Sequence, residues 1–485
     1  MTKKLTRREM VGFCGAAIVG TLTKRNSYAA AKAEHIPKFK LPLRIPPVLR
    51  PVRSDDNRDY YEICQREANV NILSTRPTTI WGYDGLFPGP TIKAKRNRSV
   101  AIRFTNHLAV PTAVHLHGGV TASEFDGFPT DVMLPGESKN CIYENSHRAA
   151  TLWYHDHAMN HGAHNIYQGL AGLYLIEDEM ESELGLPSGS WDIPLIVQDR
   201  MIAKDGSFKY EAGLGGQTGV TGNAILVNGQ PWPVLEVARR KYRFRILNAS
   251  NSTPYRLHLS SGKLFVLIAT EGGLLTAPVS CPEIFLAMAE RVEVVIDFSE
   301  YPLGTQLVLE NRNGKDSLAE VMRFDVVRQE HDNSAVPEQL ESVQLLDEHA
   351  ALRTRTFVFA SSLRFGMPPL EWMINGKRFD PDRPIVKVRL GDIEIWHFVN
   401  HNPKALGAFA MLHPVHVHLV NFQILSRNGG PPRPFENGWK DTVAIEPGED
   451  VRVIMKFEGY RGRYLIHCHN LEHEDHAMMA RFDVT

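Results

Sequence analysis

The chain has little cysteine, almost no net charge and, beyond its first residues, no apolar run long enough to cross a membrane. Five cysteines among 485 residues are too few for a scaffold held by disulfides. With 54 basic and 55 acidic side chains, the formal charge of -1 excludes a protein that binds nucleic acid through a basic face. What remains is a globular protein, 43% hydrophobic and long enough for two to four domains.

The first 31 residues have the features of an export signal. Arg7 and Arg8 precede a weakly apolar run over 11–22, and small residues follow at 27–31. The run is too short to span a bilayer, which needs ~20 residues. The stretch 6–10 resembles a twin-arginine signal, which exports folded proteins. We therefore expect a periplasmic or secreted protein with no membrane span in its mature form; the alternative is an unstructured basic tail.

Short β-branched and aromatic runs, bounded by Gly, Pro, Asn and Asp, recur along the rest of the chain. In 242–247 and 451–457, apolar and polar residues nearly alternate, as in half-buried strands. Few windows show the longer period of a helix. The pattern predicts a mostly β protein built of sandwiches or barrels.

Three stretches of the chain resemble one another. Each has an Asn-Gly or Asp-Gly turn, then a Pro-containing turn, then a strand ending in Asn106, Asn248 or Asn400. These endings are about 142 and 152 residues apart, which is the size of a domain. The sequence therefore predicts three repeated β domains over 32–185, 186–345 and 346–485, with linkers near 177–194 and 329–352.

The chain has 21 histidines, and histidine is the commonest metal ligand. Nine of them fall in four short clusters, all in the first and third repeats. On a strand, His-x-His places both imidazoles on one face. One such pair is commonly an ordinary surface feature, but four pairs, one of them around a cysteine, indicate metal binding. The clusters are His115/His117, His155/His157, His413/His416/His418 and His467/His469.

The last cluster indicates which metal binds. Cys468 can join His413 and His473, and Met478 follows ten residues after the cysteine. Two imidazoles, one thiolate and a weak axial thioether are typical of a blue-copper site, whereas structural zinc favours more thiolates. Because His467 and His469 flank Cys468, they point to the opposite side of the strand. An electron that arrives at the thiolate can then leave through the peptide toward these two imidazoles.

The four clusters, their order and the ending His-Cys-His-x3-His-x4-Met resemble those of the multicopper oxidases. Longer strings, such as His115-Leu-His-Gly-Gly-Val-Thr and Gly438-Trp-Lys-Asp-Thr, resemble the branch of bacterial spore-coat laccases and bilirubin oxidases. The similarity covers the whole mature chain. It implies an all-β fold of three consecutive cupredoxin-like Greek-key β-barrel domains and four copper ions.

The resemblance also implies a role for each clustered residue. The third domain would hold the type 1 copper, and the first and third domains would share a trinuclear cluster of one type 2 and two type 3 coppers. The type 1 ligands would be His413, Cys468, His473 and axial Met478; the type 2 ligands His115 and His416; and the type 3 ligands His117, His155, His157, His418, His467 and His469.

Two acidic residues match carboxylates that serve the trinuclear site in the family. They are Glu474 and Asp126, which we expect to deliver protons; the alternative is that both are solvated loop acids. Asp441 is expected to have a structural role, anchoring the loop near the type 1 site. His161, His164 and His476 match no family ligand. Three other cysteines, Cys64, Cys141 and Cys281, allow at most one disulfide.

The implied activity is a laccase-like oxidation. Four one-electron oxidations of phenolic, aminophenolic or bilirubin-like donors would be coupled to reduction of O2 to two waters. The alternative is a metallo-oxidase of Cu(I) or Mn(II), although the loop 401–411 has only Met411 where cuprous oxidases carry a Met-rich insert. Three repeats speak against a two-domain nitrite reductase, and the complete ligand set speaks against a non-catalytic relative. The expected partners are O2 and a small reducing organic substrate. We expect the protein to be a monomer.

Overall fold

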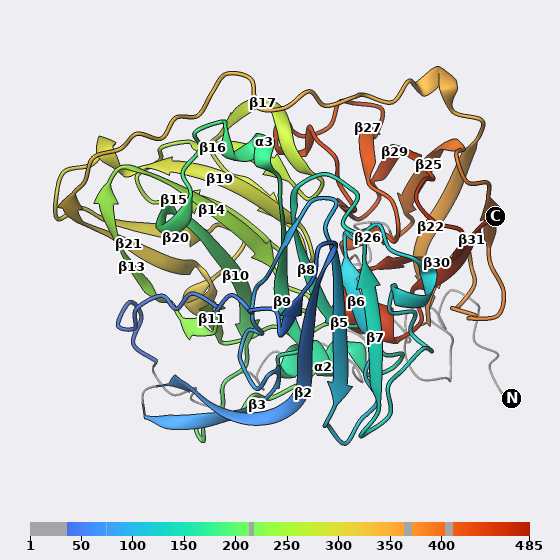
Figure 1. Ribbon diagram of the computed structural model, residues 1–485, viewed down its shortest axis with the longest axis horizontal. Helices are drawn as coiled ribbons and strands as arrows, with labels where there is room; N and C mark the ends of the chain where they lie inside the picture. The colour runs from blue at the N-terminus through green and yellow to red at the C-terminus, as the bar shows by residue number, and fades with distance from the viewer. Residues whose placement is uncertain (1–35, 74, 213–217, 363–370, 403–410) are drawn as a thin grey trace, which may run out of the picture.

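The computed structural model describes residues 36–73, 75–212, 218–362, 371–402 and 411–485. The predicted signal, residues 1–31, and most of the loop 401–411 lie outside these ranges. Across the described residues the strands form six sheets, two in each third of the chain. In Figure 1 the first domain (blue to cyan) lies in the centre, the middle domain (green to yellow) on the left and the third domain (orange to red) on the right.

The first domain packs two sheets around one core of buried side chains. One sheet contains β1 (Arg53–Ser54), β2 (Arg58–Leu73), β3 (Arg76–Tyr83), β5 (Ser99–Asn106) and β7 (Ser138–Tyr143). The other contains β4 (Ile92–Lys95), β6 (Val114–His117), β8 (Ala150–Asp156) and β9 (Ala171–Glu177), and the short helices α2 (Gly162–Gln168) and α3 (Glu179–Ser182) flank β9 in the chain.

The middle domain has the same plan and a more extensive core. Its larger sheet contains β10 (Asp192–Arg200), β11 (Ala224–Val227), β12 (Gln230–Pro231), β14 (Lys241–Asn248), β16 (Phe265–Thr270), β17 (Gly273–Cys281) and β19 (Arg291–Asp297). Its smaller sheet contains β13 (Val234–Arg239), β15 (Tyr255–Leu259), β18 (Ile284–Leu286), β20 (Gln306–Asn311) and β21 (Glu320–Gln329).

The third domain completes the series around its own core. One sheet contains β22 (Thr354–Ser362), β23 (Glu371–Ile374), β25 (Ile393–Asn400), β27 (Phe422–Arg427) and β29 (Asp450–Lys456). The other contains β24 (Val386–Val388), β26 (His413–Val417), β28 (Thr442–Ile445), β30 (Gly462–Cys468) and β31 (Met479–Val484), and the short helix α5 (Leu471–Asp475) lies between β30 and β31 in the chain. The prediction of an all-β chain is confirmed.

The turns that suggested a repeat have one structure in all three domains. Each begins with a residue of positive φ, between 50° and 55°, followed by a glycine that also has positive φ. Two consecutive residues of positive φ favour Asn-Gly or Asp-Gly. The side-chain oxygen of the first residue accepts a hydrogen bond from a backbone N–H of the adjacent strand: Asp84 from Cys64, Asn228 from Ile196 and Asn375 from Val358.

The asparagines at the strand ends are equally alike. Asn106, Asn248 and Asn400 are all buried, and each side-chain oxygen accepts from the backbone N–H two residues on. Each amide also donates to two backbone carbonyls. A buried backbone carbonyl without a hydrogen-bond partner is costly. In each domain the asparagine therefore supplies the donors that the carbonyls of the corresponding loop need.

An N-terminal strap, residues 36–52, joins the first two domains. The N–H of Phe39 donates to Trp232 and that of Leu43 to Val234 in the middle domain, both through backbone carbonyls. Later in the strap, the N–H of Leu49 donates to the backbone carbonyl of Thr91 in the first domain. Nowhere in the described ranges is there a helix with the length and apolar character of a membrane span. The four described cysteines are free thiols, so the possible disulfide is not formed among them.

Candidate metal centre

Three side chains of the third domain form a compact buried group. Cys468 Sγ lies 3.4 Å from His413 Nδ1 and 3.6 Å from His473 Nδ1, and the two nitrogens are 3.3 Å apart. His413 begins β26 and Cys468 ends β30, and these strands pair side by side. The side chain of Asn470 accepts from the N–H of His473, which turns α5 back toward the cysteine. We call these three residues the Cys–His group.

Met478 lies on the same side as this group, whereas Met479 does not. Met478 is fully buried in the core cluster that contains Cys468. The Cys468 N–H donates to the Met478 carbonyl at 3.0 Å, and the Met478 N–H donates to the His473 carbonyl at 2.9 Å. Met479 belongs to a separate cluster with Phe128 and Phe379. The contacts therefore favour Met478 as the nearby thioether.

Eight further histidines meet between the first and third domains, each no more than 1% exposed. They come from β6 and β8 with the residue after β8, and from β26 and β30 with the residues that follow them. His467 and His469 fall in this eight-histidine group, on the other side of β30 from Cys468. Within it, ligand atoms lie within 4.8 Å of one another in three sets: His117/His155/His469, His157/His418/His467 and His115/His117/His416.

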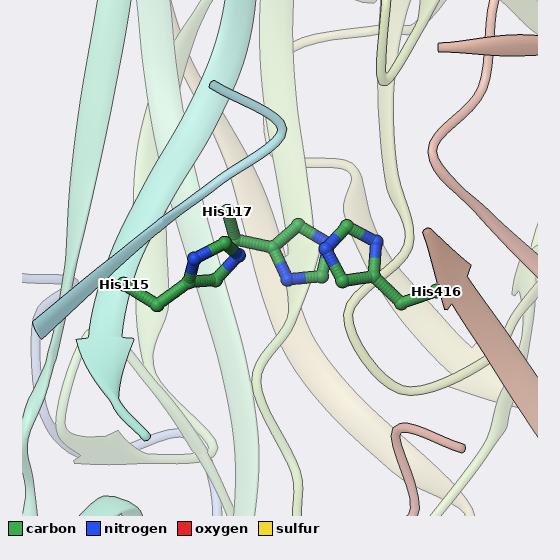
Figure 2. A group of neighbouring side chains, drawn as sticks. All are labelled: His115, His117 and His416. Atoms are coloured by element: carbon green, nitrogen blue, oxygen red, sulfur yellow. The ribbon is translucent and has the colours of Figure 1, made fainter. Parts of the chain in front are cut away.

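Figure 2 shows the third of these sets, with His115 and His117 reaching from β6 and His416 from the opposite strand. His115 Nδ1–H donates to the Asp126 carbonyl at 2.6 Å, and His416 Nδ1–H donates to the Asp441 carbonyl at 2.8 Å. Since a carbonyl only accepts, the lone pair of each ring is on Nε2. Both Nε2 atoms are buried and have no hydrogen-bond partner. An imidazole held this way is oriented for a metal.

The second set presents facing lone pairs. His418 Nδ1–H donates to Asp126 Oδ2 at 2.7 Å, and His467 Nδ1 lies 3.1 Å from Glu474 Oε2. The Nε2 atoms of His418 and His467 then face each other at 3.1 Å. Two lone pairs at this distance repel unless a cation lies between them. The buried imidazoles and the lone thiolate therefore fit bound metal, and this donor set suits copper.

The protonation of the histidines also favours metal binding. Burial lowers the pKa of His413 and of His469 to about 3 and that of His157 to about 4, so these imidazoles stay neutral at physiological pH. Burial has the opposite effect on the thiol of Cys468, whose pKa it raises above the ordinary value. Metal must therefore displace a proton from Cys468 as it binds.

The two predicted carboxylates both lie against the eight-histidine group. Asp126 uses its backbone carbonyl for His115 and its side chain for His418. Glu474 lies 3.5 Å from His157 Nε2 through Oε1. Burial alone would raise the pKa of Glu474, but its contacts with His157 and His467, including a hydrogen bond from His467, outweigh burial and lower the pKa to about 2. Neither residue is the solvated loop acid of the alternative, because both are at most 3% exposed.

Asp441 does not lie near the type 1 site, and that prediction is wrong. Its Oδ1 lies 3.1 Å from His117 Nε2, and its carbonyl binds His416. The strand β28 begins one residue later and pairs with β26, which places Asp441 beside the eight-histidine group. The structural part of the expectation stands, because Arg291 holds the carboxylate through two hydrogen bonds.

Two residues beside the histidines were not singled out from the sequence. Asp156 lies between His155 and His157; its oxygens accept from the N–H groups of Ala113 and Ala158 and from the amide of Asn165. Burial raises the pKa of Asp156 to about 7. Its position between two clustered histidines was an available signal. Arg291 stands at the start of an ordinary strand, and nothing in its sequence context indicates its role.

The remaining candidate histidines lie apart from the grouped ligands. His476 Nδ1–H donates to the Glu472 carbonyl at 2.7 Å, and His164 meets Trp81 edge-on at 5.0 Å. His161 precedes α2. Within the described ranges, none of the three belongs to a set that could hold a metal.

Comparison with known proteins gives one consistent result. Models of the family described as multicopper oxidase match residues 65–181, 191–319 and 322–485. The laccase of Bacillus subtilis (strain 168) is 37% identical, over 92% of this chain and 98% of its own. The bilirubin oxidase of Albifimbria verrucaria is 36% identical, over 96% of this chain and 84% of its own. The crystal structure of a laccase from Pediococcus acidilactici Pa5930 matches with a TM-score of 0.85 at 31% identity, covering 93% of this chain and 95% of that one. The resemblance and the three cupredoxin-like domains are confirmed.

The metal-free protein should be unstable in mild acid. Ten described histidines have a lowered pKa in the fold, and four carboxyls have a raised one: the buried Asp156, Glu271 and Glu472 and the half-buried Asp475. Below the unfolded histidine pKa of about 6.5, the unfolded chain therefore binds more protons than the folded chain. As the pH is lowered, the free energy of unfolding of the metal-free protein falls by about 1.4 kcal/mol per pH unit for each extra proton that the unfolded chain binds.

Thermal unfolding of the metal-free protein at pH 6.5, 5.5 and 4.5 checks this expectation. The midpoint should drop steeply across the series, and at each pH it should be higher for protein loaded with copper, which binds the folded chain through the same lone pairs. A flat midpoint for the metal-free protein would contradict it.

Proposed function

Because the chain belongs to the multicopper oxidase family, whose members are copper-dependent oxidoreductases that use O2, we propose that it oxidises small phenolic, aminophenolic or bilirubin-like donors. One electron leaves each donor molecule, and four electrons reduce O2 to two waters. The observation that carries the proposal is the position of Cys468. It belongs to the Cys–His group, while its two chain neighbours belong to the eight-histidine group.

The proposed ligands form four sets, one for each of four copper ions. His413, Cys468 and His473 would hold one ion in the Cys–His group, with the thioether of Met478 as a further ligand. His115 and His416 hold a second, through the Nε2 atoms that lack protein partners. His117, His155 and His469 hold a third, and His157, His418 and His467 a fourth. Copper bound in these groups supplies one-electron redox chemistry on the donor side and O2 reduction on the other.

The connection between the two groups is covalent. Cys468 is joined to His467 and His469 by single peptide bonds, and alternation along β30 sends the three side chains to two opposite sides. No gap filled with water separates the electron entry from the site where O2 is reduced. The ring of Trp372 stacks on that of His473 at 3.6 Å, and this contact holds the histidine in place on the side where electrons enter.

Proton transfer falls to Glu474 and Asp126. Glu474 is held between the rings of His157 and His467. From this position it receives a proton and passes it on from Oε1 or Oε2. Asp126 accepts from His418 Nδ1 and orients that ring while offering a second carboxylate at the other edge of the group.

We also propose that the protein is exported in the folded state to the periplasm or the medium. The support is the sequence of residues 1–31, with its arginine pair and short apolar run. N-terminal sequencing of the exported protein should find a new terminus close to residue 31, and an intact residue 1 would contradict export by this route.

Replacing Cys468 with Ser should abolish the intense visible band of the copper-loaded protein together with its oxidase activity. The thiolate is the source of that absorption, and Ser fills nearly the same volume, so the fold is retained. Absorption spectra and O2 uptake measure both effects. Cys141→Ser is the matched control, because Cys141 is buried in the core of the first domain and contacts no histidine group; it should stay blue and active. A colourless wild type with full copper would refute the assignment.

The substrate class is tested with bilirubin, a methoxyphenol, an aminophenol and Cu(I) as electron donors. Steady-state rates with O2 uptake should be highest for an organic donor. Turnover of Cu(I) alone would favour the metallo-oxidase instead.

Met478→Leu should raise the reduction potential of the copper in the Cys–His group, because a thioether stabilises Cu(II) more than a hydrocarbon does. Redox titration of the blue band measures it. Met479→Leu is the matched control, since its side chain packs in another cluster. A shift in the control and none in Met478→Leu would place the axial ligand one residue later.

Glu474→Gln should slow O2 reduction far more than it slows reduction of the blue copper by the donor. Loss of a proton carrier typically costs ~10²–10⁴-fold in rate, while the path through Cys468 is untouched. Stopped-flow bleaching of the blue band, followed by reoxidation with O2, separates the two steps. Glu472→Gln is the control, because Glu472 faces Asn251 and Tyr210 of the middle domain. Equal slowing of both steps would remove Glu474 from this role.

A further inference from the structure

The middle domain contributes no residue to the metal sets found in the described chain, yet one of its side chains reaches the eight-histidine group. Arg291, the first residue of β19, donates from Nη1 to Asp441 Oδ1 at 2.8 Å and from Nη2 to Asp441 Oδ2 at 2.7 Å. The two side chains are 0% and 1% exposed. A planar, bidentate pair of this kind fixes the orientation of the carboxylate as well as its position.

Asp441 in turn fixes two histidines in opposite orientations. Its Oδ1 lies 3.1 Å from His117 Nε2, and its backbone carbonyl lies 2.8 Å from His416 Nδ1. Because both oxygens only accept, His117 donates from Nε2 and keeps its lone pair on Nδ1, whereas His416 keeps its lone pair on Nε2. The two rings stack at 3.6 Å with an interplanar angle of 15°. One residue thus selects a different ring nitrogen on each of two adjacent ligands.

Further hydrogen bonds fix the side chain of Arg291 itself. Its Nε donates to the Thr151 carbonyl of the first domain at 2.9 Å, and Nη1 also donates to the Ala289 carbonyl at 3.1 Å. The first domain approaches so closely that a Cβ atom on Gly118 would lie 2.6 Å from both Arg291 Nη2 and Asp441 Oδ2. Gly118 directly follows His117, so the glycine of this His-x-His-Gly motif leaves room for the ion pair.

We propose that Arg291 is a positioning residue for the copper held by His115 and His416, the type 2 copper. Arg291 touches none of the histidines. It acts by holding Asp441, which sets the ring nitrogens that His117 and His416 present. This inference rests on the proposed function and extends it: the middle domain, which supplies no ligand, tunes the affinity and geometry of the O2-reducing site.

A second buried ion pair at the same boundary provides the control. Lys440 Nζ lies 2.8 and 2.7 Å from the two carboxylate oxygens of Glu271. This pair also joins the middle and third domains, and Lys440 is the chain neighbour of Asp441. No histidine ring contacts either side chain through a hydrogen bond or ion pair among the described residues. Glu271 Oε1 also accepts from the Arg291 backbone N–H at 3.2 Å, and the amide oxygen of Gln can keep that bond. Glu271→Gln therefore weakens the ion pair at the domain boundary and leaves the side-chain contact of Arg291 with Asp441 in place.

The test compares Arg291→Lys with Glu271→Gln in the full-length protein. Lysine keeps the positive charge but cannot make the bidentate contact. Copper is titrated against a competing chelator, and the type 2 copper is followed by its EPR hyperfine splitting. Arg291→Lys should raise the dissociation constant of the type 2 copper 10–100-fold, as typical for loss of such a supporting contact, and change its splitting. The blue band should keep its intensity, and Glu271→Gln should change neither quantity.

Each outcome decides the matter. Wild-type affinity and splitting in Arg291→Lys would overturn the proposal, and so would an equal copper loss in Glu271→Gln, because the effect would then be one of general stability. If Arg291→Lys does not fold, Arg291→Gln replaces it: Gln leaves no unpaired cation in the core and also cannot make the two-point contact with Asp441, so it should shift the splitting in the same way. An unchanged splitting in that variant would also overturn the proposal. A wild type that binds no type 2 copper would instead refute the proposed function.

Discussion

The mutual repulsion of buried nitrogen lone pairs is the constraint on which the rest of this structure depends. Eight buried imidazoles are held so that the lone pairs of several of their nitrogens face one another. Such an arrangement has no stability of its own in the absence of metal. It persists because strands, loops and carboxylates fix each ring from behind, as Asp126 does for His115 and His418. The three β domains are the frame that makes this possible.

The middle domain explains how such a frame stays closed. The eight-histidine group draws equal numbers of histidines from the first and third domains, which are far apart in the chain. The middle domain contacts both: Arg291 bonds to Thr151 on one side and to Asp441 on the other. On the far side of the ligand loop, Asn251 bonds to Glu472 of α5 and to the Ala163 carbonyl of α2. A domain that contributes no histidine to the eight-histidine group therefore sets the distance between the two domains that do.

Much of this could be predicted from the sequence, because its strongest signals are local. Alternation predicts strands, a turn needing two positive φ values favours Asn-Gly, and His-x-His fixes a shared face before any fold is known. The contacts that cross domains could not be predicted in this way. Arg291 and Asp441 are 150 residues apart in the chain, and neither is unusual among its neighbours. Asp441 was placed at the wrong site for the same reason: the residues before β28 gave no indication of which face of β26 they would meet.

The N-terminal strap has a consequence for the order in which the molecule can be assembled. Residues 39 and 43 are made early, but their hydrogen-bond partners are residues 232 and 234. Residues 39 and 43 of the strap must therefore wait without these partners while roughly the next two hundred residues are synthesised. The site closes later still, because His117 needs Asp441, and His157 lies against His467. A nascent chain thus has neither a fixed beginning nor a complete binding site, and both appear only when translation is almost finished. The folded-state export proposed above would begin only after that moment.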